Sequence, residues 1–250
     1  VIGLMQGLRD PVSGLMMGST AEVLAQDFGI SREEQDTFAL NSHLEAAAAQ
    51  EGGIFAEEIG PIIDDLARGK IMQDDDGIRA EQSLAAVAKL HPFFDPKNGT
   101  VTAGNSSQIS DAAAALTLMS ESEAKNRGIE PLGYMSGFAY AGLEPKRMGM
   151  GPYYATAKLF KEMGITLKDI DLIEMNEAFS VQVLANLRAF PSQHYAQAHG
   201  FDAPLGEIGE SLLNVNGGAV ALGHPGGMTG TRLVLYLLKE LRRQKKERGL

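Results

Sequence analysis

The sequence predicts an α/β fold of layered helices and strands that follows a mostly helical region. After residue 100, apolar runs of strand length alternate with helical segments, an order that is typical of α/β layered domains. Before that point the chain shows long helical patterns and charged loops, so we place a boundary near residue 110. With 250 residues, of which 44% are hydrophobic, the chain is long enough for one or two domains with a sizeable core.

Helices are predicted where apolar residues repeat at helical spacing between recognisable end signals. Ser31 and Glu34 form a capping-box pattern, and Gly29, Gly52 and Gly164 stand where glycine commonly ends a helix. The predicted helices cover residues 17–28, 32–51, 81–90 and 153–163, and two more begin near residue 177 and at residue 231.

Strands are predicted at short apolar runs, which are residues 112–119, 132–140, 169–175 and 219–222. Pro225 and the glycines after it end the last of these runs and turn the chain toward the final helix. His224 is therefore expected on a strand-to-helix turn.

Composition limits the partners and the compartment. A net charge of −10 argues against nucleic acid as the main partner, and the absence of cysteine excludes disulfides and thiolate metal sites. No apolar run approaches the roughly 20 residues that a membrane span needs. No basic and apolar leader points to secretion, so we expect a cytoplasmic protein, or one of an organelle matrix in a eukaryote.

The glycine-rich segment around His224 is the strongest candidate site. A side chain on a turn before a helix can face a cleft, nearby backbone amides can face an anion, and glycines let a ligand approach the backbone. The alternative interpretation is a tight turn with a hydrogen-bonded histidine, because one histidine in a loop proves little.

Other local motifs allow two interpretations each. Residues 99–107 are small and polar, which suits a thin ligand or an ordinary turn, and residues 148–152 indicate a loop. Asn176 could cap the helix predicted after it or position a water or an oxyanion. Asp74, Asp75 and Asp76 could bind a hard cation, but no ligand spacing follows them, which favours a solvated loop.

Taken together and in order, these motifs resemble the thiolase family, whose members cleave or condense acyl-CoA thioesters. Residues 105–111, Asn-Ser-Ser-Gln-Ile-Ser-Asp, are closer to degradative 3-ketoacyl-CoA thiolases than to biosynthetic ones. The resemblance covers nearly the whole chain through residues 17–22, 31–36, 99–107, 148–152, 176–179 and 217–230.

The resemblance implies a thiolase-like layered fold, with α-helices around mixed β-sheets and a mostly helical loop domain. Residues 1–110 would then form most of the loop domain that covers the CoA and substrate cleft. Residues 111–128 would complete the N-terminal half, and residues 129–250 would form the C-terminal half without its final segment. The chain begins at Val1 in mid-pattern, so we expect it to be part of a longer protein.

The resemblance also implies the catalytic roles. His224 would activate a nucleophilic cysteine and help to bind a thioester oxygen, and Asn176 would hold a water in the same oxyanion site. Both catalytic cysteines of the family fall outside this chain. The substrate is CoA itself, with no metal or redox cofactor, and the CoA side of the site would include Arg79, Phe94, Ala103, Ser107, Ala178 and Phe179.

Two function hypotheses follow. In the first, the chain is part of an acyltransferase that cleaves 3-ketoacyl-CoA with CoA to acetyl-CoA and a shortened acyl-CoA. This enzyme would act in fatty-acid degradation and would be a homodimer or homotetramer. The second is a cysteine-free thiolase relative that binds acyl-CoA without turning it over. In either case we expect the 250-residue chain alone to be inactive, because it has no thiol.

Overall fold

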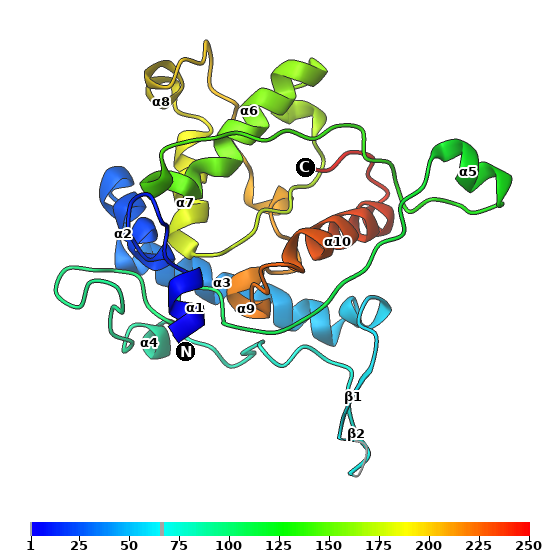
Figure 1. Cartoon of the computed structure of the whole chain (residues 1–250), viewed down its shortest axis with the longest axis horizontal. Helices are drawn as coiled ribbons and strands as arrows, with labels where there is room; N and C mark the ends of the chain where they lie inside the picture. Colours follow the sequence, from blue (N-terminus) through cyan, green and yellow to red (C-terminus); the bar gives the residue numbers. More distant parts are fainter. Residues whose placement is uncertain (1, 66–67) are drawn as a thin grey trace.

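The computed structural model describes residues 2–65 and 68–250 and is built mainly of helices (Figure 1). The α-helices are α1 (Ile2–Gly7), α2 (Met17–Phe28), α3 (Arg32–Glu51), α4 (Leu84–Val87), α5 (Glu121–Asn126), α6 (Gly151–Met163), α7 (Ser180–Ala189), α8 (Gln193–Ala198), α9 (Ala219–Leu222) and α10 (Thr229–Gln244). Short 3-10 turns are η1 (Phe55–Glu57), η2 (Pro145–Met150), η3 (Leu167–Asp169) and η4 (Glu210–Leu212). No helix in the described part of the chain is long and apolar enough to cross a membrane.

The main helices agree with the end signals of the sequence. The hydroxyl of Ser31 accepts from the Glu34 N–H at 3.2 Å, and the Glu34 carboxylate accepts from the Ser31 N–H at 2.7 Å, which confirms the capping box of α3. Gly29 and Gly164 end α2 and α6 with φ values of 61° and 66°, in the left-handed region that glycine adopts at little cost.

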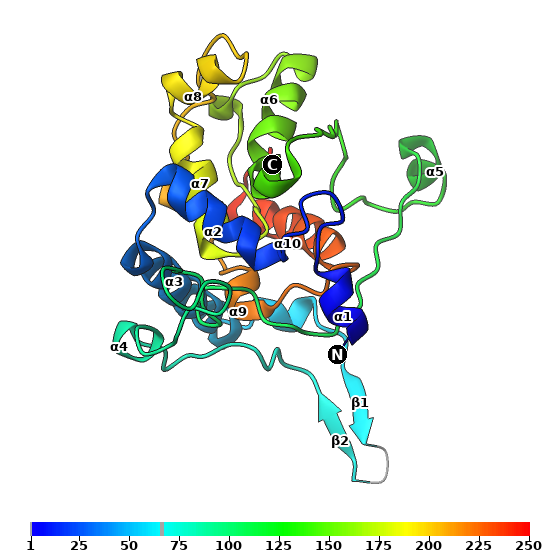
Figure 2. The same ribbon diagram turned by 60° about the vertical axis from the view of Figure 1, so that its left-hand side comes forward.

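Two apolar clusters hold these helices together. The larger one packs α2, α6 and α7 around fully buried side chains that include Leu24, Tyr153 and Phe190. The smaller one packs α3 and η1 against α9 and α10 through Ala46, Ala49, Phe55, Ala221, Leu222 and Tyr236. Figure 2 shows α9 between α3 and α10. The residues just before His224 are therefore fixed in a core.

The structure contains less sheet than the sequence predicts. In the described residues the named strands are β1 (Ile62–Asp65) and β2 (Lys70–Met72), an antiparallel hairpin that projects from the body (Figures 1 and 2). The strands predicted at residues 112–119 and 132–140 are wrong for this structure. Both segments run unpaired and mostly exposed, with Leu118 at 79% and Phe138 at 68% exposure, because no neighbouring strand supplies ladder hydrogen bonds.

Other predicted elements are shifted or reduced. Residues 219–222 form the one-turn helix α9 and not a strand, since a short apolar run does not distinguish a strand from a buried helix. Within residues 169–175, Leu172 and Ile173 make only isolated parallel bridges, to Gly249 and Leu213. The helix predicted near residue 177 begins at Ser180, and the pattern at residues 81–90 forms only α4.

Candidate functional site

His224 and Asn176 lie side by side although they are far apart in sequence. Nδ2 of Asn176 is 3.5 Å from Nδ1 and 3.4 Å from Nε2 of His224. His224 lies in the turn between α9 and α10, and Asn176 lies in the extended segment before α7. Both side chains are half-buried, so the pair joins two of the motifs that the sequence singled out.

Thr229, at the start of α10, sets the tautomer of His224. Its hydroxyl donates to the Pro225 carbonyl at 3.0 Å and lies 2.7 Å from Nδ1 of His224. Because a hydroxyl has one hydrogen, Thr229 accepts from Nδ1–H, which leaves Nε2 unprotonated, with the Asn176 amide N–H group 3.4 Å away as its donor. The sequence analysis gave Thr229 no role, since a side-chain contact within a loop leaves no pattern in the sequence.

The environment of His224 favours the neutral form of its ring. Burial lowers the pKa of His224, and the positive charge of Arg232 lowers it further. A neutral imidazole with an unprotonated Nε2 is the form that acts as a general base near neutral pH.

Asn176 is not a helix cap, so that interpretation is wrong. Phe179 is the N-cap residue of α7, and no side chain caps this helix end. Oδ1 of Asn176 is buried and has no hydrogen-bond partner among the described residues. Oδ1 is therefore available to accept a hydrogen bond from a water beside His224.

Glu177 fixes the segment that carries Asn176. Its carboxylate accepts from the Ser42 hydroxyl at 2.6 Å, from Nδ2 of Asn214 at 2.8 Å and from the Val220 N–H at 3.1 Å. A Cβ at Gly218 would lie 2.1 Å from Cδ of Glu177, so this approach requires glycine. Burial raises the pKa of Glu177. This network joins α3, the Asn176 segment and α9, and the sequence analysis assigned it no role.

Residues 105–107 lie along the start of α7. The Ser107 N–H donates to the Ala178 carbonyl at 2.9 Å, and the Ser180 N–H donates to the Asn105 carbonyl at 2.9 Å. These bonds place Ser107 beside Ala178, another residue that the resemblance assigns to the CoA side of a site. Residues 103 and 104 form a turn, so a turn and a ligand-binding segment both remain interpretations of this stretch.

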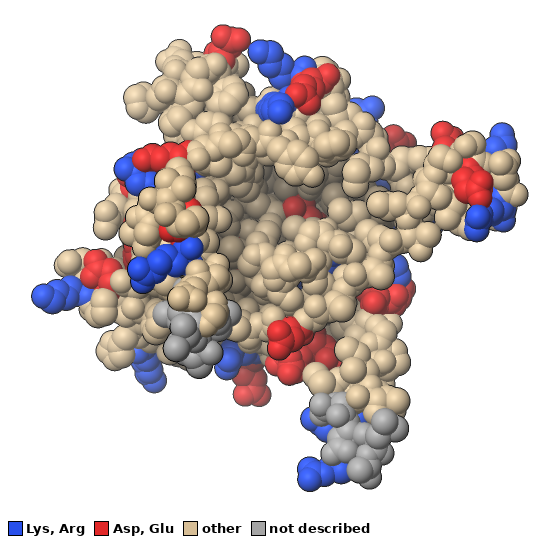
Figure 3. All heavy atoms as spheres, in the orientation of Figure 1, with Lys and Arg blue, Asp and Glu red and all other residues tan. Residues whose placement is uncertain are grey.

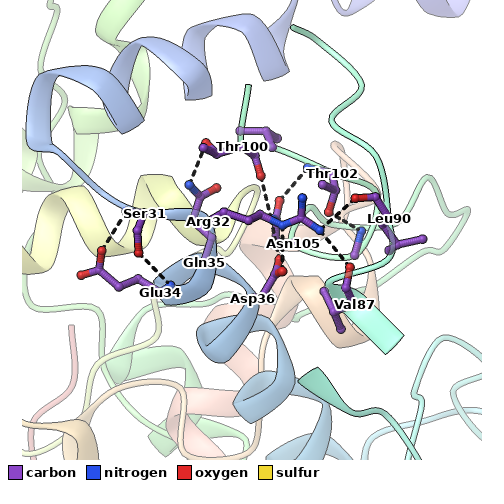
Figure 4. Close-up of polar contacts among 12 residues, drawn as sticks. Ser31, Arg32, Glu34, Gln35, Asp36, Val87, Leu90, Thr100, Thr102 and Asn105 are labelled. Carbon is purple, nitrogen blue, oxygen red and sulfur yellow. Dashed lines mark hydrogen bonds and ion pairs between the residues drawn. The ribbon is translucent and has the colours of Figure 1, made fainter. Parts of the chain in front are cut away.

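Buried acids hold the preceding residues in place. The Glu22 carboxylate accepts from the N–H groups of Thr100 and Val101 at 2.9 and 2.8 Å. Nδ2 of Asn105 donates to the Asp36 carboxylate at 2.9 Å, in the polar network at the start of α3 (Figure 4). Because α2 and α3 both contribute an acid, the segment is fixed relative to the helical core.

Of the remaining residues predicted on the CoA side, Phe94 contacts another predicted residue, whereas Arg79 and Ala103 do not. The rings of Phe94 and Phe179 meet edge to face, with centroids 6.2 Å apart. Arg79 is exposed, and its N–H donates to Nδ1 of His43 at 3.2 Å. Ala103 is exposed at a turn. The contacts of the described residues therefore do not link Arg79 or Ala103 to the His224–Asn176 pair.

A cavity of about 440 Å³ adjoins the histidine loop. It is lined by residues 110–114 on one side and residues 225–228 on the other. Figure 3 shows that the drawn face is hollowed near its centre, with mainly uncharged side chains at the rim and an acidic group inside the hollow. Asp111 is the charged residue among those that line the cavity.

Two other motifs have structural roles. Residues 148–152 join η2 to α6, where Nδ2 of Asn186 donates to the Gly149 carbonyl at 2.8 Å. Oδ1 of Asp75 accepts from the Gly77 N–H at 2.9 Å and closes a turn. Within residues 2–65 and 68–250, no group of three His, Cys, Asp or Glu residues is arranged to hold a metal ion.

Glu174, in the same extended segment, should make stability depend on pH. Burial is the main cause that raises its pKa to about 8, so the folded chain keeps a proton that an unfolded Glu loses near pH 4.5. This stabilisation is complete below pH 4.5 and is lost as the pH rises through about 8. As the pH rises from 5.5 to 8.5, the wild type should lose unfolding free energy that Glu174→Gln keeps, because glutamine does not ionise. Urea denaturation of both proteins at the two pH values measures this difference.

Glu81→Gln, at an exposed position, is the matched control and should follow the wild type at both pH values. If wild type and Glu174→Gln differ in unfolding free energy by the same amount at both pH values, the pKa of Glu174 is not raised.

Comparison with known proteins identifies the family. Residues 2–122 match the N-terminal domain of thiolases, and residues 129–250 match the thiolase C-terminal domain. The chain belongs to the thiolase family. A 3-ketoacyl-CoA thiolase of Yersinia enterocolitica is 44% identical over 239 residues, which are 93% of this chain and 53% of that relative. This thiolase chain therefore spans about half the length of the curated relatives it matches.

Solved thiolase structures share its fold. The acetyl-CoA acetyltransferase of Bacillus anthracis matches with a TM-score of 0.87 at 39% identity, over 99% of this chain and 59% of that one. Human mitochondrial 3-ketoacyl-CoA thiolase matches with a TM-score of 0.84 at 38% identity, over 98% and 58% of the two chains, and it has also been solved in complex with CoA. The thiolase fold is thus confirmed, although the described chain contains little of the predicted sheet.

Proposed function

We propose that this chain supplies the histidine and CoA-contacting part of a thiolase. The whole protein would cleave 3-ketoacyl-CoA with CoA to acetyl-CoA and a shortened acyl-CoA, in fatty-acid degradation, as a homodimer or homotetramer. Residues 1–110 would cover the cleft, residues 111–128 would complete the N-terminal half, and residues 129–250 would form the C-terminal half. The observation that carries this proposal is the His224–Asn176 pair, with Thr229 on Nδ1 of the ring.

The pair supplies a base and a polar group beside it. Thiolysis needs a nucleophile for the acyl group, an acid/base for the acetyl-CoA carbanion and donors for two oxyanions. The unprotonated Nε2 of His224 can take the proton of a thiol, and Oδ1 of Asn176 can hold a water that donates to a developing oxyanion. The thiol itself has to come from a cysteine, and the 250-residue chain contains none.

A second candidate function is acyl-CoA binding without turnover, which needs only the contacts on the CoA side of the site. The CoA side of the site supports both functions equally. It is formed by Ser107, Ala178, Phe179 and Phe94, whose contacts are present in this chain.

The test compares the chain with the longer protein that contains it. We expect the 250-residue chain to bind CoA in calorimetry and to show no thiolysis. The longer protein, which would include the cysteines, should convert 3-ketoacyl-CoA and CoA to acetyl-CoA and a shortened acyl-CoA. Chromatography of the CoA esters measures this conversion. CoA binding without turnover in the longer protein supports the second candidate. A failure of the chain to bind CoA contradicts both.

Ser107→Ala should weaken CoA binding selectively. The loss of one neutral hydrogen bond should reduce the binding free energy of CoA by about 1 kcal/mol, which raises the dissociation constant roughly fivefold. Ser136→Ala, at an exposed position outside these contacts, is the matched control. Unchanged affinity in Ser107→Ala would remove Ser107 from the CoA side of the site.

A further inference from the structure

Gln108 joins three segments of the chain. Its Nε2 donates to the Gly77 carbonyl at 2.8 Å and to the Ala221 carbonyl at 3.0 Å, which uses both hydrogens of the amide. Its own carbonyl accepts from the His224 N–H at 3.4 Å. A Cβ at Gly77 would lie 2.7 Å from the Ala221 carbonyl oxygen, so the segments meet backbone to backbone. Gln108 therefore contacts the turn at Gly77, helix α9 and the turn that follows α9.

The contacts of Gln108 lie where the histidine turn leaves α9. The last carbonyls of a helix have no partner within the helix, and the Gln108 amide supplies one for Ala221. Gly223 then turns the chain with a φ of 87°, in the region that favours glycine. His224 follows, and its backbone N–H is held by the Gln108 carbonyl. Because α9 is buried in the core, these bonds tie the exit of the turn to a fixed element.

The residue before Gln108 reaches the other half of the site. The Ser107 N–H donates to the Ala178 carbonyl at 2.9 Å, two residues after Asn176 in the chain. Two consecutive residues thus bridge the segments that carry Asn176 and His224, whose Nδ2 and Nε2 atoms are 3.4 Å apart. The position of Gln108 therefore bears directly on that separation.

We propose that Gln108 is a positioning residue of the site: its amide closes the end of α9 and its carbonyl holds the His224 N–H, which fixes the turn that presents the imidazole to Asn176. The catalytic meaning of this arrangement rests on the function proposed above. The arrangement itself, a donor that keeps His224 beside Asn176, does not depend on turnover.

The turn at Gly77 leads to Arg79, which has an anchor of its own. The Arg79 N–H donates to Nδ1 of His43 on α3 at 3.2 Å, and Ile78 packs against the smaller apolar cluster. Burial is the main cause that lowers the pKa of His43 to about 4, so its Nδ1 stays an acceptor at neutral pH. Loss of the Gln108 amide should therefore displace the histidine turn more than the CoA side of the site.

The test measures the ring nitrogen signals of His224 in the 250-residue chain by NMR at neutral pH. His224→Gln identifies the signals, and Asn176→Ala gives the position of the Nε2 signal without its donor. We expect Gln108→Met, which keeps the length and removes the donors, to move the Nε2 signal toward that of Asn176→Ala. Gln108→Glu should do the same, because a carboxylate has no hydrogen to donate. Gln73→Met, at an exposed position, is the matched control and should leave the signal in place.

In the longer protein with its cysteines, Gln108→Met should separate turnover from binding. We expect kcat for thiolysis to fall about 10- to 100-fold, because a small displacement of a catalytic group has an effect of that order. The CoA dissociation constant should stay near that of the wild type, since Arg79 keeps its anchor on α3.

The outcomes separate hydrogen bonding from packing. A wild-type Nε2 signal in Gln108→Met or Gln108→Glu overturns the proposal, because either side chain fills the same space, and so does an equal change in Gln73→Met. If circular dichroism shows that these two Gln108 variants do not fold, Gln108→Asn replaces them: its shorter arm should still move the signal, and a wild-type signal overturns the proposal. A longer protein without turnover would contradict the proposed function and leave the NMR result standing.

Discussion

His224→Ala should lower kcat about 100- to 10,000-fold in the cysteine-containing protein, with little change in CoA affinity. In the proposed function the ring would accept a proton through Nε2 and face the oxyanion site, and both interactions would strengthen in the transition state. CoA affinity would depend instead on the contacts around Ser107 and Phe179. The measurement is kcat for thiolysis together with the CoA dissociation constant of each variant.

Two further variants test the geometry around His224. Asn176→Ala should lower kcat as well, because in the proposed function Oδ1 of Asn176 would hold a water that donates to the same oxyanion. Thr229→Val keeps the shape and removes the hydroxyl, so it should lower kcat by freeing the tautomer of His224. His91→Ala, which removes an exposed histidine, is the control. Near-normal turnover in His224→Ala would show that His224 has no catalytic role and only stabilises the turn.

The sequence predicted those parts of the fold and the site that depend on local signals. The capping box of Ser31 and Glu34 and the glycines that end α2 and α6 are short-range patterns, and their helices form as predicted. The His224 loop and the Asn176 segment were found through motif order, and the structure brings them within 3.5 Å.

The features that were missed depend on long-range contacts. An apolar run such as residues 132–140 becomes a strand only beside another strand, and the described chain supplies none there. Residues 219–222 form a helix because α3 and α10 bury them on several sides. The roles of Thr229 and Glu177 arise from side-chain contacts, with His224 in the same loop and with residues far away in sequence, so composition and periodicity carry no trace of them.

Glu177→Ala should cost about 3–5 kcal/mol of unfolding free energy. The substitution leaves three buried donors without their acceptor, namely the Ser42 hydroxyl, Nδ2 of Asn214 and the Val220 N–H. Each unsatisfied donor costs roughly 1–3 kcal/mol, and water entering the space recovers part of that sum. The measurement is urea unfolding followed by circular dichroism.

Two variants show whether the network or the loss of a charge is responsible. Glu177→Gln keeps one acceptor for Ser42 and Val220 but turns an amide donor toward Asn214, so its stability should fall between those of wild type and Glu177→Ala. Glu51→Ala, exposed at the end of α3, should stay within about 0.5 kcal/mol of the wild type. Because α9 leads directly to His224, Glu177→Ala should also disturb the NMR signal of His224, whereas Glu51→Ala should not. Wild-type stability in Glu177→Ala would mean that the three donors find other acceptors, and that Glu177 does not hold the site together.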